Sequence, residues 1–272
     1  MQYLNITPDG HVERSYCEEI AEHLKPYADN NTRLIVRDWQ QETPANNGER
    51  YILIITSAEG HKYLPEEQND PLCLGVFMHY LTKIDIGKQY EPDGFVDINK
   101  LYSFPLGTTK FFVPGEYIPY HERKYDFCFI GQLDPYRRRH FYNCIHHLSN
   151  KANCYVSFYN GWNNGLSGEE YSNILRNSKI ALVPWGSASL DTFRFYEACQ
   201  SGCVVLSDIQ NRYDFMTASG HIEISDWINV EREINKILSH EHSDKISEYT
   251  KNFWEQNLSP RACAKYILEK IK

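Results

Sequence analysis

Arg194 and Glu197 are the pair whose residue types and spacing best suit ligand chemistry in this 272-residue sequence. They stand three positions apart in a helix expected over 191–201, so they share one side of it with Asp191. A guanidinium pairs well with phosphate oxygens, and a carboxylate accepts hydrogen bonds from ribose hydroxyls. The pair therefore suits a nucleoside diphosphate. A solvated ion pair within the helix is the alternative that the spacing alone leaves open.

The segments around this helix predict a strand–loop–helix–strand unit. The apolar run at 180–183 and the β-branched run at 203–206 suit buried parallel strands. Ser189 or the aspartate two positions later would cap the helix, and Gly202 follows its end, where a left-handed residue is favoured. Ligands bind beyond the carboxyl ends of such strands, next to helix N-termini. We therefore expect Ser187 and Ser189 at a donor site.

The same stretch resembles the donor-nucleotide segment of GT-B glycosyltransferases, and within that fold the exostosin-like group. The sequence carries T-x-R-F-Y-E-A-x(3)-G-C-V-V, where the group has R-x-x-[DE]-A followed by G-C-[IV]-P-[VI]. Val205 stands where the group usually has proline. The similarity covers about 125–208, and the residues that match are Arg194, Glu197, Ala198, Gly202 and Cys203.

The resemblance implies an α/β fold of GT-B type, with two Rossmann-like doubly wound domains facing a cleft, the N-terminal one small. We expect an acceptor-side domain over 1–115 and a nucleotide-sugar-binding domain over 120–259. A stretch rich in Pro and Gly before Glu122 marks the crossing between them. The C-terminal helix at about 260–272 would pack back on the first domain.

The second half alternates strands and helices, which predicts a parallel, doubly wound sheet. Ser167 to Glu170 has the pattern of a capping box, and Ser259 followed by Pro260 suits the start of the last helix. The expected strands are 125–130, 154–159, 180–183, 203–206 and 222–224, and the expected helices include 136–149, 228–239, 243–256 and 260–271.

The first half shows about four strands, which is few for the fold. Ser15 to Glu18 has the pattern of a second capping box, and the helix behind it ends before Pro26. The expected strands are 3–6, 34–36, 51–55 and 74–78.

Two further loops are expected at the donor site. Gly131 follows a strand, and the three arginines Arg137, Arg138 and Arg139 enter the next helix, where one or two of them could face donor phosphates. A solvated basic turn is the alternative. Trp162, in the loop after the strand at 154–159, could stack on a base or a sugar, or simply fill the loop.

An inverting sugar transfer also needs a base that deprotonates the acceptor hydroxyl. In the GT-B arrangement this base usually comes from an N-terminal-domain loop. Glu59 is our choice because it follows the strongest strand of the first half, and His61 and His79 are alternates. Histidine has the better unperturbed pKa, whereas the pKa of a glutamate would have to be raised by burial. A retaining transfer would need no such base.

Composition excludes several classes of protein. The formal net charge of −8 argues against a general nucleic-acid binder. Eight scattered cysteines without metal-type spacing indicate reduced, buried thiols and a cytoplasmic protein. No stretch reaches the length of a membrane span, so association with a membrane would be peripheral, at its inner face. D-x-D, G-x-G-x-x-G, P-loop and G-x-S-x-G motifs are absent.

The sequence therefore predicts a metal-independent glycosyltransferase with no resident cofactor. Its donor would be a nucleotide-diphosphate sugar, with UDP the first expectation, and its acceptor a saccharide or lipid-linked saccharide of cell-surface polysaccharide or lipopolysaccharide synthesis. The alternatives are a non-catalytic nucleotide- or carbohydrate-binding module, which the small first domain favours, and a scaffold subunit of a polysaccharide assembly complex.

Overall fold

A computed structural model describes residues 1–9, 11–27, 29–45, 48–58, 64–81, 97–133, 138–150, 153–161, 164–186, 191–208 and 218–272. The chain divides into two compact units, each with its own sheet. Among the described residues, unit 1 comprises 1–110 and 255–272, and unit 2 comprises 111–208 and 218–254. None of the helices in these ranges has the length and apolar character that crossing a membrane requires.

Unit 2 is built on a five-stranded parallel sheet with the order β11-β10-β9-β7-β8. Each strand coincides closely with an apolar run of the sequence. The direction of winding reverses between β7 and β9, and ligands bind at such a reversal in open α/β sheets. The strands are β7 (Tyr125–Gln132), β8 (Cys154–Tyr159), β9 (Ser178–Val183), β10 (Val204–Asp208) and β11 (Ile222–Ile224).

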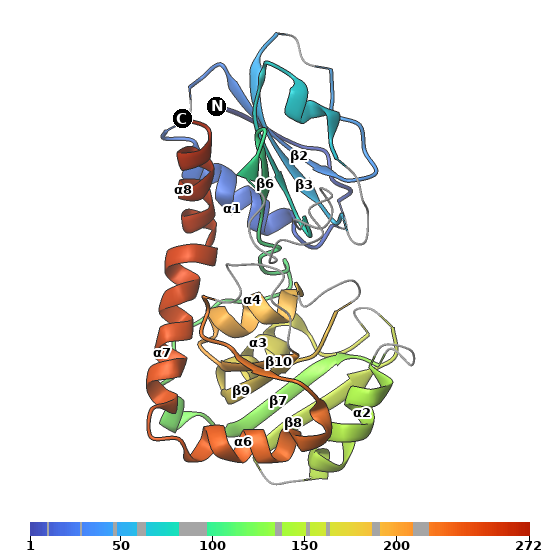
Figure 1. Cartoon of the computed structure of the whole chain (residues 1–272), viewed down its shortest axis with the longest axis vertical. Helices are drawn as coiled ribbons and strands as arrows, with labels where there is room; N and C mark the ends of the chain where they lie inside the picture. The colour runs from blue at the N-terminus through green and yellow to red at the C-terminus, as the bar shows by residue number, and fades with distance from the viewer. Residues whose placement is uncertain are drawn as a thin grey trace. The chain divides into compact units, whose positions relative to one another are not determined.

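Helices cover both faces of this sheet, as a doubly wound fold requires (Figure 1). One face packs Phe129, Leu182 and Leu206 against α2 (Arg139–Ile145), the short helix η3 (His146–Asn150) and α6 (Val230–Ser239). The other face is covered by α3 (Gly168–Arg176) and α4 (Phe193–Gln200), and α7 (Ser243–Phe253) packs on α4.

The helix boundaries of unit 2 follow local sequence signals in part. The capping box at Ser167 is confirmed, because its side chain accepts from the backbone N–H of Glu170 while the Glu170 carboxylate accepts in return. Gly202 has φ +68° after the end of α4, as expected. The start of α4 was predicted wrongly. It begins at Phe193 after Thr192, without a side-chain cap, so Asp191 precedes the helix.

Unit 1 is built on a six-stranded sheet with the order β1-β2-β3-β4-β6-β5, so the expectation of about four strands is corrected. The two strands missed in the sequence are the shortest in the sheet. All neighbours are parallel except β5 and β6. The strands are β1 (Gln2–Asn5), β2 (Thr32–Asp38), β3 (Arg50–Thr56), β4 (Cys73–Met78), β5 (Asp97–Ile98) and β6 (Leu101–Ser103).

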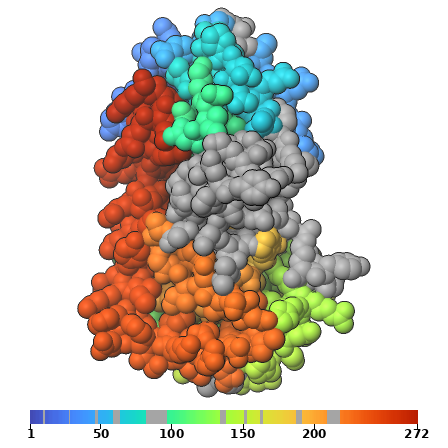
Figure 2. All heavy atoms as spheres, viewed as in Figure 1, coloured from blue at the N-terminus to red at the C-terminus, as the bar shows by residue number. Residues whose placement is uncertain are grey.

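Two helices far apart in the sequence pack together in unit 1, namely α1 (Arg14–Leu24) and α8 (Pro260–Lys270) (Figures 1 and 2). The buried Tyr16 hydroxyl donates to the Leu258 carbonyl at 2.5 Å and lies 3.1 Å from the Cys263 thiol. The cap of α8 is confirmed, since Ser259 accepts from the Ala262 N–H. The remaining short helices are η1 (Glu66–Asn69), η2 (Tyr120–Glu122), η4 (Trp227–Asn229) and the π-helical turn η5 (Trp254–Leu258).

The capping box predicted at Ser15 is wrong. Residue Glu13 occupies the N-cap position of α1, and no side chain caps the helix there. The carboxylate of Glu13 contacts His11 and accepts a hydrogen bond from Ser57 instead. These contacts lie at the edge of the unit 1 sheet where the parallel strands have their carboxyl ends.

Gly107 supports the packing of Tyr16, which yields a stability prediction. Gly107 has φ +77°, and a Cβ there would lie 2.3 Å from the Tyr16 ring. We expect Gly107→Ala to lower the unfolding free energy of unit 1 by roughly 2 to 5 kcal/mol, because left-handed strain and overpacking add. Gly48→Ala is the matched control, since Gly48 has φ +82° and none of the described residues lies within 4 Å of its Cβ position. If urea unfolding shows the same decrease in unfolding free energy for the two variants, the Tyr16 contact does not have this role.

Candidate functional site

The carboxyl edge of the unit 2 sheet is tied together by Arg138, at the reversal between β7 and β9. Its Nη1 donates to the carbonyl of Gln132, which ends β7, at 3.0 Å. Its Nε donates to the carbonyl of Trp185, just beyond β9, at 3.3 Å. One guanidinium thus bridges the two strand ends where the topology predicts a ligand.

A second guanidinium, that of Arg194 in α4, lies against the same end of β7. Its Nε and Nη2 donate to the Ile130 carbonyl at 3.1 and 2.9 Å, and its Cζ lies 4.7 Å from the centre of the Phe129 ring. A Cβ on Gly131 would lie 2.2 Å from Nη2. Gly131 is therefore the residue that leaves room for Arg194, so the structure brings these two predicted site residues into contact.

Glu197 lies one turn after Arg194 in α4, as predicted, and is 3% exposed. It accepts a hydrogen bond of 2.7 Å from the hydroxyl of Tyr171 in α3. Burial, followed by the nearby Glu197 charge, raises the pKa of Tyr171, so the phenol stays a donor. Asp191 is also buried and accepts from the Tyr196 hydroxyl at 2.6 Å.

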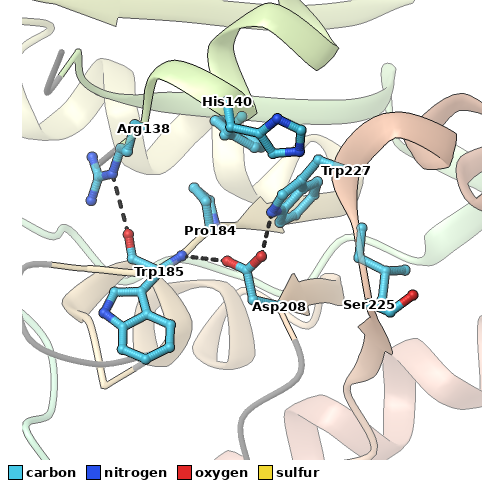
Figure 3. A pocket seen from close by; sticks show the side chains of 9 residues that line it. Arg138, His140, Pro184, Trp185, Asp208, Ser225 and Trp227 are labelled. Carbon is cyan, nitrogen blue, oxygen red and sulfur yellow. Dashed lines mark hydrogen bonds between the residues drawn. The ribbon is translucent and has the colours of Figure 1, made fainter. Parts of the chain in front are cut away.

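A pocket of about 340 Å³ opens beside Arg138, over the carboxyl ends of β9, β10 and β11 (Figure 3). Its walls combine aromatic rings with a few polar groups, which is the usual composition of a small-molecule site. Its lining includes Arg138, His140, Phe141, Trp185, Asp208 and Trp227.

Asp208 is the central acceptor of this pocket. Its two carboxylate oxygens accept from the backbone N–H of Trp185 at 2.6 Å and from the indole N–H of Trp227 at 2.5 Å (Figure 3). Burial raises the pKa of Asp208, although both hydrogen bonds act in the opposite direction. The carboxylate orders the loop after β9 and the turn after β11 around the pocket.

His140, at the rim of the pocket, belongs to a group of potential metal ligands. The ligand atoms of His140, Cys144 and Asp226 lie within 4.8 Å of one another. The His140 ring already pairs with the Asp226 carboxylate at 2.8 Å, and both side chains are exposed. Burial, followed by the Asp226 charge, raises the pKa of Cys144 and disfavours the thiolate that a metal would bind. The group has the character of a surface hydrogen-bonded cluster.

The predicted donor residues thus occupy different places. Arg138 lines the pocket, Gly131 and Arg194 contact each other at the end of β7, and Glu197 is buried in α4. Arg139 begins α2 with an exposed side chain. Four predicted residues lie outside the described ranges, namely Arg137, Trp162, Ser187 and Ser189.

Sequence reasoning missed the aromatic and acidic groups of the pocket. The signal that could have revealed them is their position just after, or at the end of, an expected strand. This holds for Trp185, Asp208 and Trp227. Carboxyl ends of parallel strands meet at one edge of a sheet, so polar or aromatic residues at these ends gather there.

In unit 1, the described candidate for the base is His79, directly after β4. Its side chain is 0% exposed, and its ring stacks on Phe104 with a centroid distance of 6.1 Å. Burial lowers the pKa of His79 to about 4, which leaves it a weak base buried away from solvent. Glu59 and His61 lie outside the described residues.

The described residues around His79 form a polar cluster that sequence reasoning missed. His11 Nδ1 lies 2.5 Å from Glu13 Oε2, and His79 Nδ1 lies 4.0 Å from Glu13 Oε1. His11 Nε2 lies 3.1 Å from the Ser57 hydroxyl oxygen and 3.2 Å from Asp38 Oδ2. The polar cluster stands at the carboxyl ends of β1 to β4, and no sequence motif connects its members.

Comparison with solved structures shows the fold class. The glycosyltransferase from Rickettsia africae ESF-5 is 14% identical, with a TM-score of 0.53 over 99% of this chain and 97% of that one. The glycotransferase of kitacinnamycin is 9% identical, with a TM-score of 0.50 over 99% and 98%. A chain of the GtfA/B complex is 10% identical, with a TM-score of 0.47, and the match spans 93% of this chain but only 60% of that one. The protein has the α/β fold of GT-B glycosyltransferases, as the first two likenesses show.

Residues 112–253 match the family of the RXYLT1 C-terminal domain. This segment is just over half of the 272 residues, and the chain belongs to that family. The resemblance to exostosin-like GT-B glycosyltransferases drawn from the sequence is thereby confirmed. Comparison with curated protein sequences yields no match.

The burial of His79 yields a pH prediction. Its folded pKa of about 4 lies below the unfolded value of 6.5, so protons bind the unfolded state first as the pH falls. The contribution of the neutral His79 ring to the free energy of unfolding is therefore fully present above pH 6.5. It is lost as the pH falls to 4, by roughly 3 kcal/mol. We expect His79→Phe to remove that loss in urea unfolding followed from pH 7.5 to 4.

The matched control is His23→Phe, on the exposed face of α1. This variant should keep the wild-type dependence of stability on pH. If the unfolding free energies of the wild type and of His79→Phe fall in parallel as the pH drops, the buried His79 ring is not the group that causes the loss of stability.

Proposed function

We propose that the protein transfers a sugar from a nucleotide-diphosphate sugar, with UDP as nucleotide, to a saccharide or lipid-linked saccharide acceptor. The acceptor would belong to cell-surface polysaccharide or lipopolysaccharide synthesis. Membership of the RXYLT1 C-terminal domain family and the GT-B fold support sugar transfer. The observation that carries the proposal is the Arg194 guanidinium, seated over Gly131 at the strand end where the winding reverses.

The charge of Arg194 suits a diphosphate. Among the described residues, its hydrogen bonds end on the Ile130 carbonyl rather than on a carboxylate. The guanidinium carries more N–H donors than one carbonyl accepts, so donors and positive charge remain for phosphate oxygens. Together with Arg138 it would stabilise the diphosphate that leaves the sugar, which a metal ion does in other enzymes. We therefore propose transfer without a metal.

The pocket beside Arg138 suits the nucleoside part of the donor. Its volume of about 340 Å³ falls in the range of small-molecule sites. The rings of Trp185 and Trp227 offer surfaces on which a base stacks, and Asp208 offers acceptor oxygens. Glu197, one turn from Arg194, would accept from ribose hydroxyls while Tyr171 holds its other side.

We further propose that the protein acts in the cytoplasm, peripherally at the inner face of the membrane, where lipid-linked acceptors are available. The eight cysteines support a reducing compartment, because all are free and six are buried, where burial raises the pKa of thiols such as Cys199.

Calorimetric titration with UDP, GDP, CMP and their sugar conjugates tests the donor site. We expect Arg194→Ala to weaken binding of one nucleotide about 10- to 100-fold, because a charged hydrogen bond is lost. Gly131→Ala should weaken it similarly with Arg194 still present, since the new Cβ displaces the guanidinium. Glu197→Gln should weaken binding of ribonucleotides while keeping side-chain size.

Arg176→Ala is the matched control, because Arg176 also donates to a backbone carbonyl of unit 2, that of Val113 at 2.7 Å. Its nucleotide binding should equal that of the wild type. A wild type that binds none of these nucleotides would overturn the donor site. Selective binding without turnover would support a nucleotide-binding module instead of an enzyme.

A further inference from the structure

The polar cluster of unit 1 joins separate segments of the chain at one edge of its sheet. His11 lies between β1 and α1, Glu13 stands at the start of α1, Asp38 ends β2, and Ser57 follows β3. Three of these side chains are largely withdrawn from water, with His11 13%, Glu13 2% and Asp38 15% exposed. Ser57 adds backbone strain, with φ +55° in a residue other than glycine. Buried charge is costly unless its partners are well placed, so the contacts within the polar cluster decide whether these segments stay together.

The His11 ring is the centre of the polar cluster, because each of its nitrogens faces a carboxylate. Nδ1 lies 2.5 Å from Glu13 Oε2, and Nε2 lies 3.2 Å from Asp38 Oδ2. A carboxylate oxygen only accepts hydrogen bonds, so each nitrogen needs a proton to face one. A neutral imidazole has a single N–H and satisfies one of the two carboxylates. The imidazolium, with two N–H groups and a positive charge, satisfies both.

The hydroxyl of Ser57 does not replace the second ring proton. It donates to Glu13 Oε1 at 3.1 Å, and its oxygen lies 3.1 Å from His11 Nε2, where it is a further acceptor for the ring N–H. Without a proton on Nε2, the lone pair of this nitrogen would face the Asp38 carboxylate and the Ser57 oxygen. The contact between the ring and Asp38 would then change from attraction to repulsion.

Asp38 is a fixed anchor for the ring. Its Oδ1 accepts from the backbone N–H of Gln40 at 2.9 Å, and its own N–H donates to the side chain of Gln41 at 2.9 Å. The turn after β2 therefore holds the carboxylate in place in either charge state of the ring. The segment that carries His11, before α1, is the partner that yields when the attraction is lost.

We propose that His11 is a protonation-dependent latch within unit 1. While the ring is charged, it holds its own segment, before α1, against the ends of β2 and β3, and loss of its proton releases that segment. The latch consists of residues of unit 1 alone and does not depend on the proposed donor site of unit 2.

The charges around the ring set the direction of the latch. Burial alone would lower the pKa of His11, but its contacts with Glu13 and Asp38 outweigh burial and raise the pKa above 6.5. A group whose pKa is raised in the folded state contributes stability below its unfolded pKa and loses that contribution as the pH rises through the folded value. The latch is therefore closed below pH 6.5 and opens on the alkaline side of the raised pKa.

The other ionisable groups around the ring keep their charge states over this range. Burial alone would raise the pKa of Glu13, but the contact with His11 and the neighbouring His79 outweigh burial and keep the pKa below 4.5. His79 stays neutral because burial lowers its pKa to about 4, and burial raises the pKa of the Cys17 thiol. The charged side chains of the adjacent described segments have other partners, namely Asp9, Arg14, Arg37 and Lys110.

Nuclear magnetic resonance tests the latch in the wild-type chain between pH 6 and 9. At pH 6 the nitrogen signals of the His11 ring should be those of an imidazolium, and they should titrate to the neutral ring with a midpoint above 6.5. The backbone N–H of His11 donates to the Pro8 carbonyl at 2.8 Å. Its protection factor against hydrogen exchange should fall about 10- to 100-fold over the same range, as the loss of a charged hydrogen bond implies.

Controls separate release of this segment from loosening of the whole unit. The backbone N–H of Phe104, which donates to the Met78 carbonyl at 2.9 Å in unit 1, should keep its protection factor. His11→Gln should show the low protection at every pH, because its side chain does not titrate. Asp38→Asn should lower the midpoint of the ring by about one pH unit or more, since a nearby carboxylate favours the imidazolium. His23→Gln, which changes an exposed histidine of α1, should match the wild type.

A His11 ring that is neutral at pH 6 would overturn the latch, and so would an equal protection factor of its amide at pH 6 and pH 9. Both measurements use the wild type and decide the question even if His11→Gln fails to fold. A midpoint that stays unchanged in Asp38→Asn would also overturn it. No nucleotide enters the test, so failure of the latch leaves the proposed sugar transfer standing, and a chain that binds no nucleotide leaves the latch standing.

Discussion

A carboxylate removed from water must be supplied with hydrogen-bond donors, and this requirement organises the carboxyl edge of both sheets. In unit 2, Asp208 draws in the backbone N–H of Trp185 and the indole N–H of Trp227, which fixes two loops around the pocket. In unit 1, Glu13 holds the His11 ring and the Ser57 hydroxyl. In each unit a single carboxylate thus holds groups from two different segments of the chain.

Two arginines, one buried and one half-buried, perform the complementary task for carbonyl groups. Arg123 is 3% exposed and donates to the carbonyls of Ser178 and Ser201 at 2.8 and 2.9 Å, joining the start of β9 to the end of α4. Arg138 does the same at the opposite ends of β7 and β9. Strand–helix units of a parallel sheet leave orphan carbonyls at their junctions. A planar guanidinium with several fixed donors satisfies two junctions at once.

Most of the unit 2 fold could be predicted because its signals are local. Apolar runs bounded by polar residues gave the strands, and Ser167 and Gly202 marked helix ends through contacts within a few residues. The polar cluster of unit 1 has no such signal. His11, Asp38 and Ser57 are single polar residues separated by long stretches, and only parallel pairing of β1, β2 and β3 brings them together. The false capping box at Ser15 failed because α1 already begins at Arg14, which places Ser15 inside the helix and pairs Glu18 with the Arg14 side chain.

The contact between Gly131 and Arg194 couples the amino acids that these two distant positions can carry. The guanidinium occupies the space that any other side chain at 131 would need. A relative that replaces this glycine must first lose or shorten the arginine, and a relative that loses the arginine no longer needs the glycine. Aligned family members should therefore show the two residues present or absent together. Exceptions to this pairing would mark lineages in which the anion, if one is bound, is held by a different group.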